Sequence, residues 1–227
     1  MLTSNISMSP KIKKIIYSLL AIVSAILLYF YQQIKTYQTQ QNLILVTEVL
    51  DGDTLIIAPD QSIRLANIDA PEIERCQGKE AKDFLTNLIQ DKRVKIISAG
   101  RDAYKRTVAL IYLPNGQLVN EIMAQKGMGV YTSTNTKERE KINQAVEDAR
   151  EKKMGIFSPL CSQTENLDNP KCNIKGNIGK HDRAKYYHLP QCAEYNRTVV
   201  ELHLGEQWFC TENEAIKAGY AKSKNCP

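Results

Sequence analysis

The sequence predicts an α+β fold that is mainly β: a small five-stranded barrel carrying three helices, with an N-terminal transmembrane helix before it and a small disulfide-rich α+β module after it. Three observations support this prediction. Short runs rich in β-branched residues, bounded by turn signals, recur within the first half of the chain. A long uncharged segment lies near the N-terminus, and all six cysteines follow it. The 227 residues leave room for one or two domains plus such appendages.

The barrel strands are predicted from β-branched runs at residues 43–50, 54–58, 62–68, 93–97 and 107–113. Helices are predicted where apolar residues recur at intervals of three and four, around residues 81–89, 118–127 and 142–155. Five strands with one helix between the third and the fourth are typical of an OB-type barrel. The exposed face and loops of such barrels commonly receive oligonucleotides.

The N-terminal segment predicts a membrane anchor. Residues 15–31 carry no charged side chain, a basic tail of residues 1–14 precedes them, and a polar spacer of residues 32–42 follows. Basic residues ahead of an apolar segment favour a cytoplasmic N-terminus, with everything downstream exported. The apolar segment ends in bulky residues rather than a small-x-small cleavage site, which favours an uncleaved anchor over a cleaved signal peptide. Three lysines of the tail account for most of the net charge of +5, so global charge says little about nucleic-acid binding.

The cysteines agree with export. Their number is even, as expected for disulfides in an oxidising compartment. The favoured arrangement joins Cys76 to Cys161 at the end of the barrel domain and pairs the remaining four within the C-terminal module. The six residues are Cys76, Cys161, Cys172, Cys192, Cys210 and Cys226.

The C-terminal module is predicted at residues 172–227, after a linker at residues 161–171. A strand is expected at residues 198–204, and a capping box at residues 211–214 is expected to open a short helix that closes at Gly219. A core this small usually needs disulfides or a metal. Zinc is conceivable because the module also holds His181, His188 and His203, but it lacks a C-x-x-C pair, which favours disulfides.

Three short motifs carry the chemistry: Asp51-Gly52-Asp53-Thr54, the segment 64–72, and the segment 102–106. Asp53 and Asp69 are hard oxygen ligands suited to a divalent cation. Arg64 and Arg106 stay charged and offer planar paired donors to phosphate oxygens. Glu72 follows Asp69 closely and can orient or deprotonate a water molecule. This combination is what the hydrolysis of a phosphodiester requires.

In the order and spacing of these motifs, residues from about 43 to 157 resemble the staphylococcal nuclease family. The resemblance implies an OB-type nuclease domain, assigned to residues 43–160. It implies that Asp53, Asp69 and the Ala70 carbonyl ligate calcium. Arg64 and Arg106 would then stabilise the scissile phosphate, and Glu72 would activate water.

The resemblance also implies substrate-binding residues. Tyr104 matches a family position near a terminal phosphate, and Tyr131 is a candidate for stacking on a base. Lys105 stands where glycine is common in the family, which adds positive charge and makes the left-handed backbone expected there unusual. Ala70 replaces the family's usual threonine, a change that a ligand acting through its backbone oxygen tolerates.

Two functions follow as expectations. The first is a calcium-dependent endonuclease acting on DNA and RNA, preferentially single-stranded, and leaving 3′-phosphate ends. It would work outside the cytoplasm of a bacterium, anchored in the membrane or secreted if the N-terminal segment is cleaved. The second is an inactive barrel that only binds single-stranded nucleic acid. The presence of all five polar site residues favours the enzyme, and the sequence identifies no protein partner.

Overall fold

A computed structural model describes residues 9–41, 43–179 and 182–227, with the backbone alone for residues 36–41. The start of the predicted basic tail, the last residue of the polar spacer and His181 therefore lie outside the described residues. The chain divides into two compact units, one reaching to Leu43 and the other spanning Ile44–Pro227.

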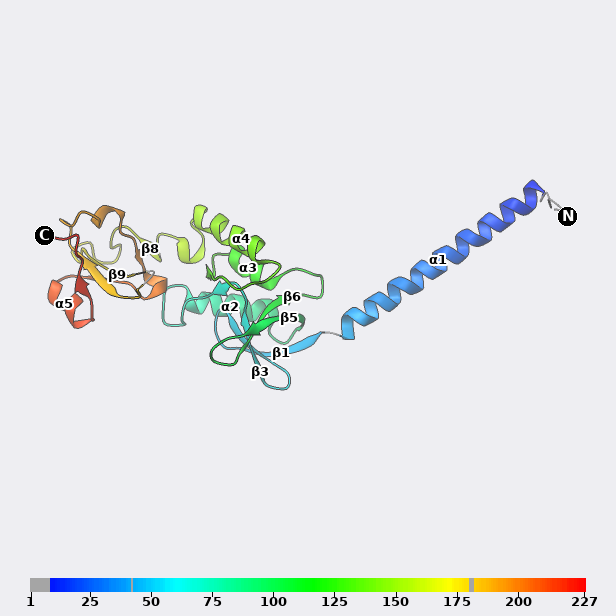
Figure 1. Ribbon diagram of the computed structural model, residues 1–227, viewed down its shortest axis with the longest axis horizontal. Helices are drawn as coiled ribbons and strands as arrows, with labels where there is room; N and C mark the ends of the chain where they lie inside the picture. Colours follow the sequence, from blue (N-terminus) through cyan, green and yellow to red (C-terminus); the bar gives the residue numbers. More distant parts are fainter. Residues whose placement is uncertain (1–8, 42, 180–181) are drawn as a thin grey trace, which may run out of the picture. The chain divides into compact units, whose positions relative to one another are not determined.

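The first unit is the long helix α1, Pro10–Gln41 (Figure 1). It contains the predicted transmembrane segment and continues through the polar spacer. Residues Pro10–Lys35 are long and apolar enough to cross a membrane, and α1 is the one helix of this kind in the described part of the chain. Its large apolar side chains, such as those of Leu19 and Leu27, are exposed, as lipid-facing residues would be.

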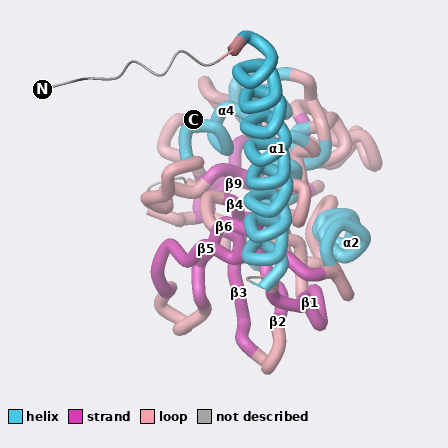
Figure 2. The backbone as a smooth tube through the Cα atoms, turned by 90° about the vertical axis from the view of Figure 1, so that its right-hand side faces the viewer, coloured by secondary structure: helices cyan, strands magenta, loops and turns pink. Residues whose placement is uncertain are grey.

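The second unit begins with a closed five-stranded barrel in the order β1-β2-β3-β6-β5, which confirms the predicted fold (Figure 2). Strands β3 and β6 run parallel, while the other neighbouring strands run antiparallel. The parallel register sets Ile63 opposite Thr107. The strands are β1 Ile44–Val49, β2 Thr54–Ile57, β3 Gln61–Leu65, β5 Arg93–Arg101 and β6 Thr107–Tyr112.

The predicted strand at residues 62–68 is wrong at its end, because Asn67 interrupts it. Asn67 has a positive φ of 64° and is fully buried. Its side-chain amide donates to the carbonyls of Thr132 (2.9 Å) and Thr134 (2.7 Å). The chain then forms β4, Ile68–Asp69, which pairs with β7, Val130–Tyr131, outside the barrel sheet. Asn67 therefore separates the strand that carries Arg64 from the segment that carries Asp69.

The three predicted helices are present as α2 Gly78–Ile89, α3 Val119–Gln125 and α4 Arg139–Glu151. Their buried side chains include Leu85, Met123 and Ile142, which join one continuous core with residues of the barrel strands. Asn120 in α3 is fully buried, and its amide oxygen accepts the backbone N–H of Ile111 at 2.9 Å. This bond ties the helix to β6 beside the core.

The C-terminal residues form a four-stranded sheet in the order β12-β9-β10-β13 over a second core. The predicted strand at residues 198–204 is wrong in its second half. Only β11, Val200–Glu201, is extended, and Leu202–Leu204 forms a 3₁₀ turn whose first N–H donates to the Cys161 carbonyl. β11 pairs with β8, Ser162–Gln163, inside the segment expected to be a linker. The sheet strands are β9 Ile174–Ile178, β10 Lys185–His188, β12 Gln207–Phe209 and β13 Ala221–Lys222.

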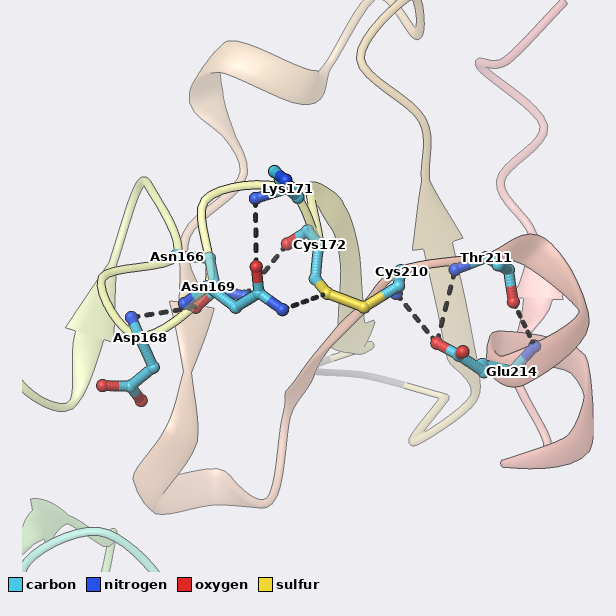
Figure 3. Close-up of a disulfide and its surroundings, with 8 residues drawn as sticks. All are labelled: Asn166, Asp168, Asn169, Lys171, Cys172, Cys210, Thr211 and Glu214. Carbon is cyan, nitrogen blue, oxygen red and sulfur yellow. Dashed lines mark hydrogen bonds between the residues drawn. A yellow bond between two sulfur atoms is a disulfide. The ribbon is translucent and has the colours of Figure 1, made fainter.

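Three disulfides join Cys76 to Cys161, Cys172 to Cys210 and Cys192 to Cys226. The first is the favoured pair, and the other two lie within the C-terminal module. Beside Cys210, Glu214 completes the predicted capping box with Thr211 at the start of α5, Glu212–Lys217 (Figure 3). The four module cysteines are therefore engaged with one another. No group of three or more His, Cys, Asp or Glu side chains suited to a metal occurs among the described residues.

Candidate active site

The turn before β2 is built by Asp51. Its Oδ1 accepts the backbone N–H groups of Asp53 (2.9 Å) and Thr54 (2.7 Å). These bonds close a tight loop, for which short polar residues such as Asp51 are well suited. The loop presents Asp53 immediately before β2, where its side chain is buried and 4% exposed.

Asp53 is a buried carboxylate with three hydrogen-bond donors. The Thr54 hydroxyl donates to its Oδ1 at 2.8 Å, and the Ala70 N–H donates to its Oδ2 at 2.9 Å. Arg64 Nη1 donates to Oδ1 at 2.5 Å. Desolvation by burial nonetheless raises the pKa of Asp53 to about 7, against the opposing charge of Arg64. Loss of water from this carboxylate is thus the largest single influence on its protonation.

Arg64 links the barrel to the segment beyond it. It lies in β3 opposite Thr54, and its Nη2 donates to Asp69 Oδ1 while Nη1 holds Asp53. Because both bonds come from one planar guanidinium, the two carboxylate oxygens that accept them must lie close to each other. Asp69 is half exposed, so this pair opens onto solvent.

Three glycines allow close packing around the segment that carries Asp69. A β-carbon on Gly52 would lie 2.6 Å from that of Ala70, and one on Gly129 would lie 2.8 Å from the Asp69 carbonyl oxygen. One on Gly78 would lie 1.9 Å from the Glu72 carbonyl oxygen. Real β-carbons do not approach so closely, so these positions require glycine on steric grounds alone. Periodicity in the sequence gives no sign of this packing.

The segment 102–106 is a turn organised by Asp102. Its Oδ1 accepts the N–H groups of Tyr104 and Arg106, each at 2.9 Å, and its Oδ2 accepts Arg106 Nε at 2.7 Å. Slight burial raises the pKa of Asp102, but the hydrogen bonds and charge of Arg106 outweigh it, so the net shift is downward. Arg106 Nη1 also donates to the Thr54 hydroxyl at 3.3 Å. Thr54 therefore connects Arg106 with Asp53.

These groups meet in one open cleft of about 710 Å³, here called the carboxylate cleft. Five of the predicted site residues line it together: Arg64, Asp69, Glu72, Tyr104 and Arg106. Asp53 lies beneath it, held by Arg64. Two further acidic residues, Asp51 and Asp102, also line the cleft. The sequence predicts no role for Asp51, although it belongs to the first motif.

Two predicted site residues lie elsewhere. Tyr131 is in β7 opposite Ile68, packs against the core, and is not among the residues lining the cleft. Lys105 lies on the far side of the turn and lines a neighbouring cleft instead. Its positive φ of 66° shows that the loop keeps the left-handed conformation with lysine in place of glycine.

The donor set fits a hard divalent cation. Asp53 and Asp69 present oxygens toward a common point now held by Arg64, and a carboxylate desolvated as strongly as Asp53 is stabilised by a nearby cation. Within the described part of the chain, no third acidic, histidine or cysteine side chain joins Asp53 and Asp69 in a group suited to a metal, so a backbone carbonyl such as that of Ala70 and water would complete the coordination.

The fold and the cleft define a class of protein: a closed five-stranded barrel with one opening lined by two arginines and several carboxylates, and a further carboxylate, Asp53, buried beneath it. The family described as staphylococcal nuclease homologue matches residues 62–159. An uncharacterized endonuclease of Escherichia coli is 36% identical over 117 residues, covering 50% of this chain and 75% of its own. The micrococcal nuclease of Shigella flexneri is 32% identical over 131 residues, covering 50% and 72%.

The thermonuclease of Staphylococcus intermedius is 31% identical over 126 residues, covering 50% of this chain and 74% of its own. This protein belongs to the staphylococcal nuclease family. The conclusion agrees with the resemblance carried by the three motifs, and it assigns the chain to the nuclease hydrolases.

Proposed function

We propose that this protein is a calcium-dependent endonuclease that hydrolyses phosphodiester bonds of DNA and RNA, prefers single strands and leaves 3′-phosphate ends. The observation that supports it best is the convergence of Arg64, Asp69, Glu72 and Arg106 in one cleft. A site that only bound nucleic acid would not need a buried carboxylate such as Asp53 in contact with a phosphate-binding arginine.

In this proposal the two arginines grip the scissile phosphate. Arg106 is oriented by Asp102, while Arg64 turns from the carboxylates toward the phosphate oxygens. Both guanidiniums neutralise the charge that grows on the equatorial oxygens as water attacks. Tyr104, which is 81% exposed at the rim, contacts the adjoining nucleotide.

Asp53, Asp69 and the Ala70 carbonyl would hold the calcium ion. When bound, the ion adds positive charge beside the phosphate and favours ionisation of water. Glu72, exposed at the cleft, accepts the proton of the attacking water. The water oxygen bonds to phosphorus, the bond to the 5′-oxygen breaks, and that oxygen takes a proton from solvent. The phosphate then stays on the 3′ side.

We place the enzyme outside the cytoplasm, held by α1. The apolar helix preceded by lysines and the three disulfides in the following unit support this placement. The domain division at residues 43–160 and 172–227 belongs to the same proposal. Protease added outside spheroplasts should degrade the second unit, and full protection of that unit would contradict the orientation.

The test of activity uses the full chain in non-ionic detergent micelles with a single-stranded oligonucleotide, in calcium or in a calcium chelator. Cleavage in calcium alone, with mass spectrometry showing 3′-phosphate fragments, is the expected result. Binding without cleavage in calcium would favour the inactive barrel. Fragments with 5′-phosphates would contradict the assigned bond, and cleavage in chelator would contradict the metal.

A further inference from the structure

A second cleft opens on the other side of the Tyr104–Arg106 turn. It has a volume of about 450 Å³ and is here called the outer groove. Tyr104 and Arg106 line both the outer groove and the carboxylate cleft, so the two openings share a wall. The remaining lining residues are Asp60, Gln61, Ser62, Arg101, Lys105 and Thr107.

The topology of the barrel brings the walls of this groove together. The turn between β2 and β3 forms one side, and the end of β5 with the turn before β6 forms the other. Parallel pairing of β3 with β6 places these segments next to each other, with Ile63 opposite Thr107. The Gln61 side-chain amide donates to the Thr107 hydroxyl at 2.9 Å and ties the two sides.

The outer groove is positively charged. Arg101, Lys105 and Arg106 face a single acidic residue, Asp60. Arg106 is paired with Asp102, whereas Arg101 and Lys105 are exposed and take part in none of the ion pairs found among residues 9–41, 43–179 and 182–227. Exposed cations without an acidic partner can bind an anion without first breaking an ion pair.

The loop that carries Lys105 has a defined conformation. Lys105 N–H donates to the Asp102 carbonyl at 3.0 Å, and Asp102 N–H donates back to the Arg106 carbonyl at 3.1 Å. The same Asp102 positions Arg106 for the carboxylate cleft. A phosphate in the outer groove and a phosphate in the carboxylate cleft would thus be bound from the two sides of one turn.

We infer that the outer groove binds a second phosphate of the same polynucleotide strand through Arg101 and Lys105. The inference rests on the proposed function, since it takes the scissile phosphate to lie at Arg64 and Arg106. The intervening nucleoside crosses the exposed Tyr104 ring, over which the Arg106 guanidinium lies at 5.3 Å. The ligand is a phosphodiester backbone, and no base is read.

Two consequences follow for the substrate. A strand long enough to reach the outer groove should be cleaved with a higher kcat/KM than a dinucleotide, which offers only the scissile phosphate. Neutralising this one additional phosphate also adds to the salt dependence of binding, by about 0.7 in the slope of log K against log salt for a single strand.

The experiment compares the full chain in micelles with R101A/K105A, using a thymidine dodecamer and a thymidine dinucleotide. The ratio of kcat/KM between the long and short substrates should fall toward one in the variant. In calcium chelator, fluorescence anisotropy with the dodecamer should show a salt slope smaller by about 0.7. The variant K95A/K152A removes the same charge from exposed residues that line neither opening, and it should behave as wild type.

A charge-conserving variant, R101K/K105R, should keep the wild-type ratio and slope, which would exclude general damage to the loop. If R101A/K105A kept both wild-type values, the outer groove would have no role in binding and the inference would be overturned. If the wild type cleaved neither substrate, the proposed function would fail, and the anisotropy slopes would still decide whether the groove binds phosphate.

Discussion

Arg64 Nη1 lies 2.5 Å from Asp53 Oδ1, so the arginine assigned to phosphate binding also holds the buried carboxylate assigned to the metal. With Nη2 on Asp69, one cation lies between two anions and offsets their repulsion. A bound divalent cation would take over this role and free the guanidinium for a phosphate. Metal binding and substrate binding should therefore be coupled through Arg64.

The first prediction concerns pH. The pKa of Asp53 is raised to about 7, and a metal ligand must be deprotonated, so calcium affinity should weaken as pH falls below about 7. Calorimetry on the full chain between pH 5 and pH 8.5 measures this. Asp53→Asn should bind calcium weakly at every pH. An affinity that stays constant down to pH 5 would contradict both the raised pKa and the ligand assignment.

Without calcium, the free energy of unfolding should change with pH in the direction opposite to the calcium affinity. A carboxyl whose folded pKa lies above its ordinary value of 3.8 binds its proton more tightly in the folded state. Its contribution to stability is therefore complete below about pH 4 and is lost as pH rises through about 7. Thermal unfolding in chelator should show this fall in wild type, and Asp53→Asn should lack it.

The second prediction distinguishes the direct role proposed for Arg106 from the positioning role of Asp102. Arg106→Ala should lower kcat by roughly a hundredfold to a thousandfold, because a charge that stabilises the transition state is lost. Arg106→Lys should restore little, since an ammonium lacks the planar fork. Asp102→Asn keeps part of the hydrogen bonding to Arg106 and should cost about tenfold.

Circular dichroism and thermal unfolding of the same variants show whether the fold survives. A kcat for Arg106→Ala within twofold of wild type would refute its assignment. If Asp102→Asn were as damaging as Arg106→Ala while remaining folded, Asp102 would have a direct role rather than a positioning one.

The third prediction concerns Cys76 and Cys161, which lie 85 residues apart in sequence. Closing a loop of this length restricts the unfolded chain, so C76A/C161A should lower the free energy of unfolding by about 4 to 5 kcal/mol. It should also lower kcat/KM, because the bond anchors the segment that follows Glu72. C192A/C226A lies within the C-terminal module and should leave kcat/KM unchanged. Equal activity of both variants would contradict the anchoring role.

Much of this architecture can be predicted from local sequence, because β-branched runs and helical spacing record which residues must be buried. The barrel strands, the three helices and the capping box at Thr211 follow from such signals. Residue types also predicted which side chains would meet, since Arg64, Asp69, Glu72 and Arg106 are chemically complementary.

The remainder depends on contacts between distant segments. The sequence around Asn67 does not predict that its side-chain amide donates to carbonyls more than sixty residues away, or that the strand ends before this residue. The outer groove exists because β3 and β6 pair in parallel, which no local pattern specifies. Tyr131 has an aromatic ring that could stack on a base, but in β7 the residue is partly buried and packs against the core.

The last prediction tests the glycine packing around the proposed metal ligands. A β-carbon on Gly52 would lie 2.6 Å from that of Ala70 and 2.7 Å from that of Ala81. Neither atom can rotate away, so Gly52→Ala must shift the backbone of the Asp51 turn or of Ala70. We expect a loss of about 1 to 3 kcal/mol in unfolding free energy, as for other overpacked sites. Calcium affinity should fall as well, because Asp53 and the Ala70 carbonyl are displaced relative to each other.

The double variant G52A/A70G distinguishes packing from other effects of Gly52→Ala. Ala70→Gly removes the closer of the two β-carbons that the new side chain meets, and residue 70 keeps its backbone carbonyl. The double variant should therefore recover part of the calcium affinity lost in G52A. Calorimetry and thermal unfolding of both variants measure the recovery. Wild-type affinity in G52A alone would show that this contact does not position the ligands, whereas rescue by A70G would tie the geometry of the cation site to one steric contact.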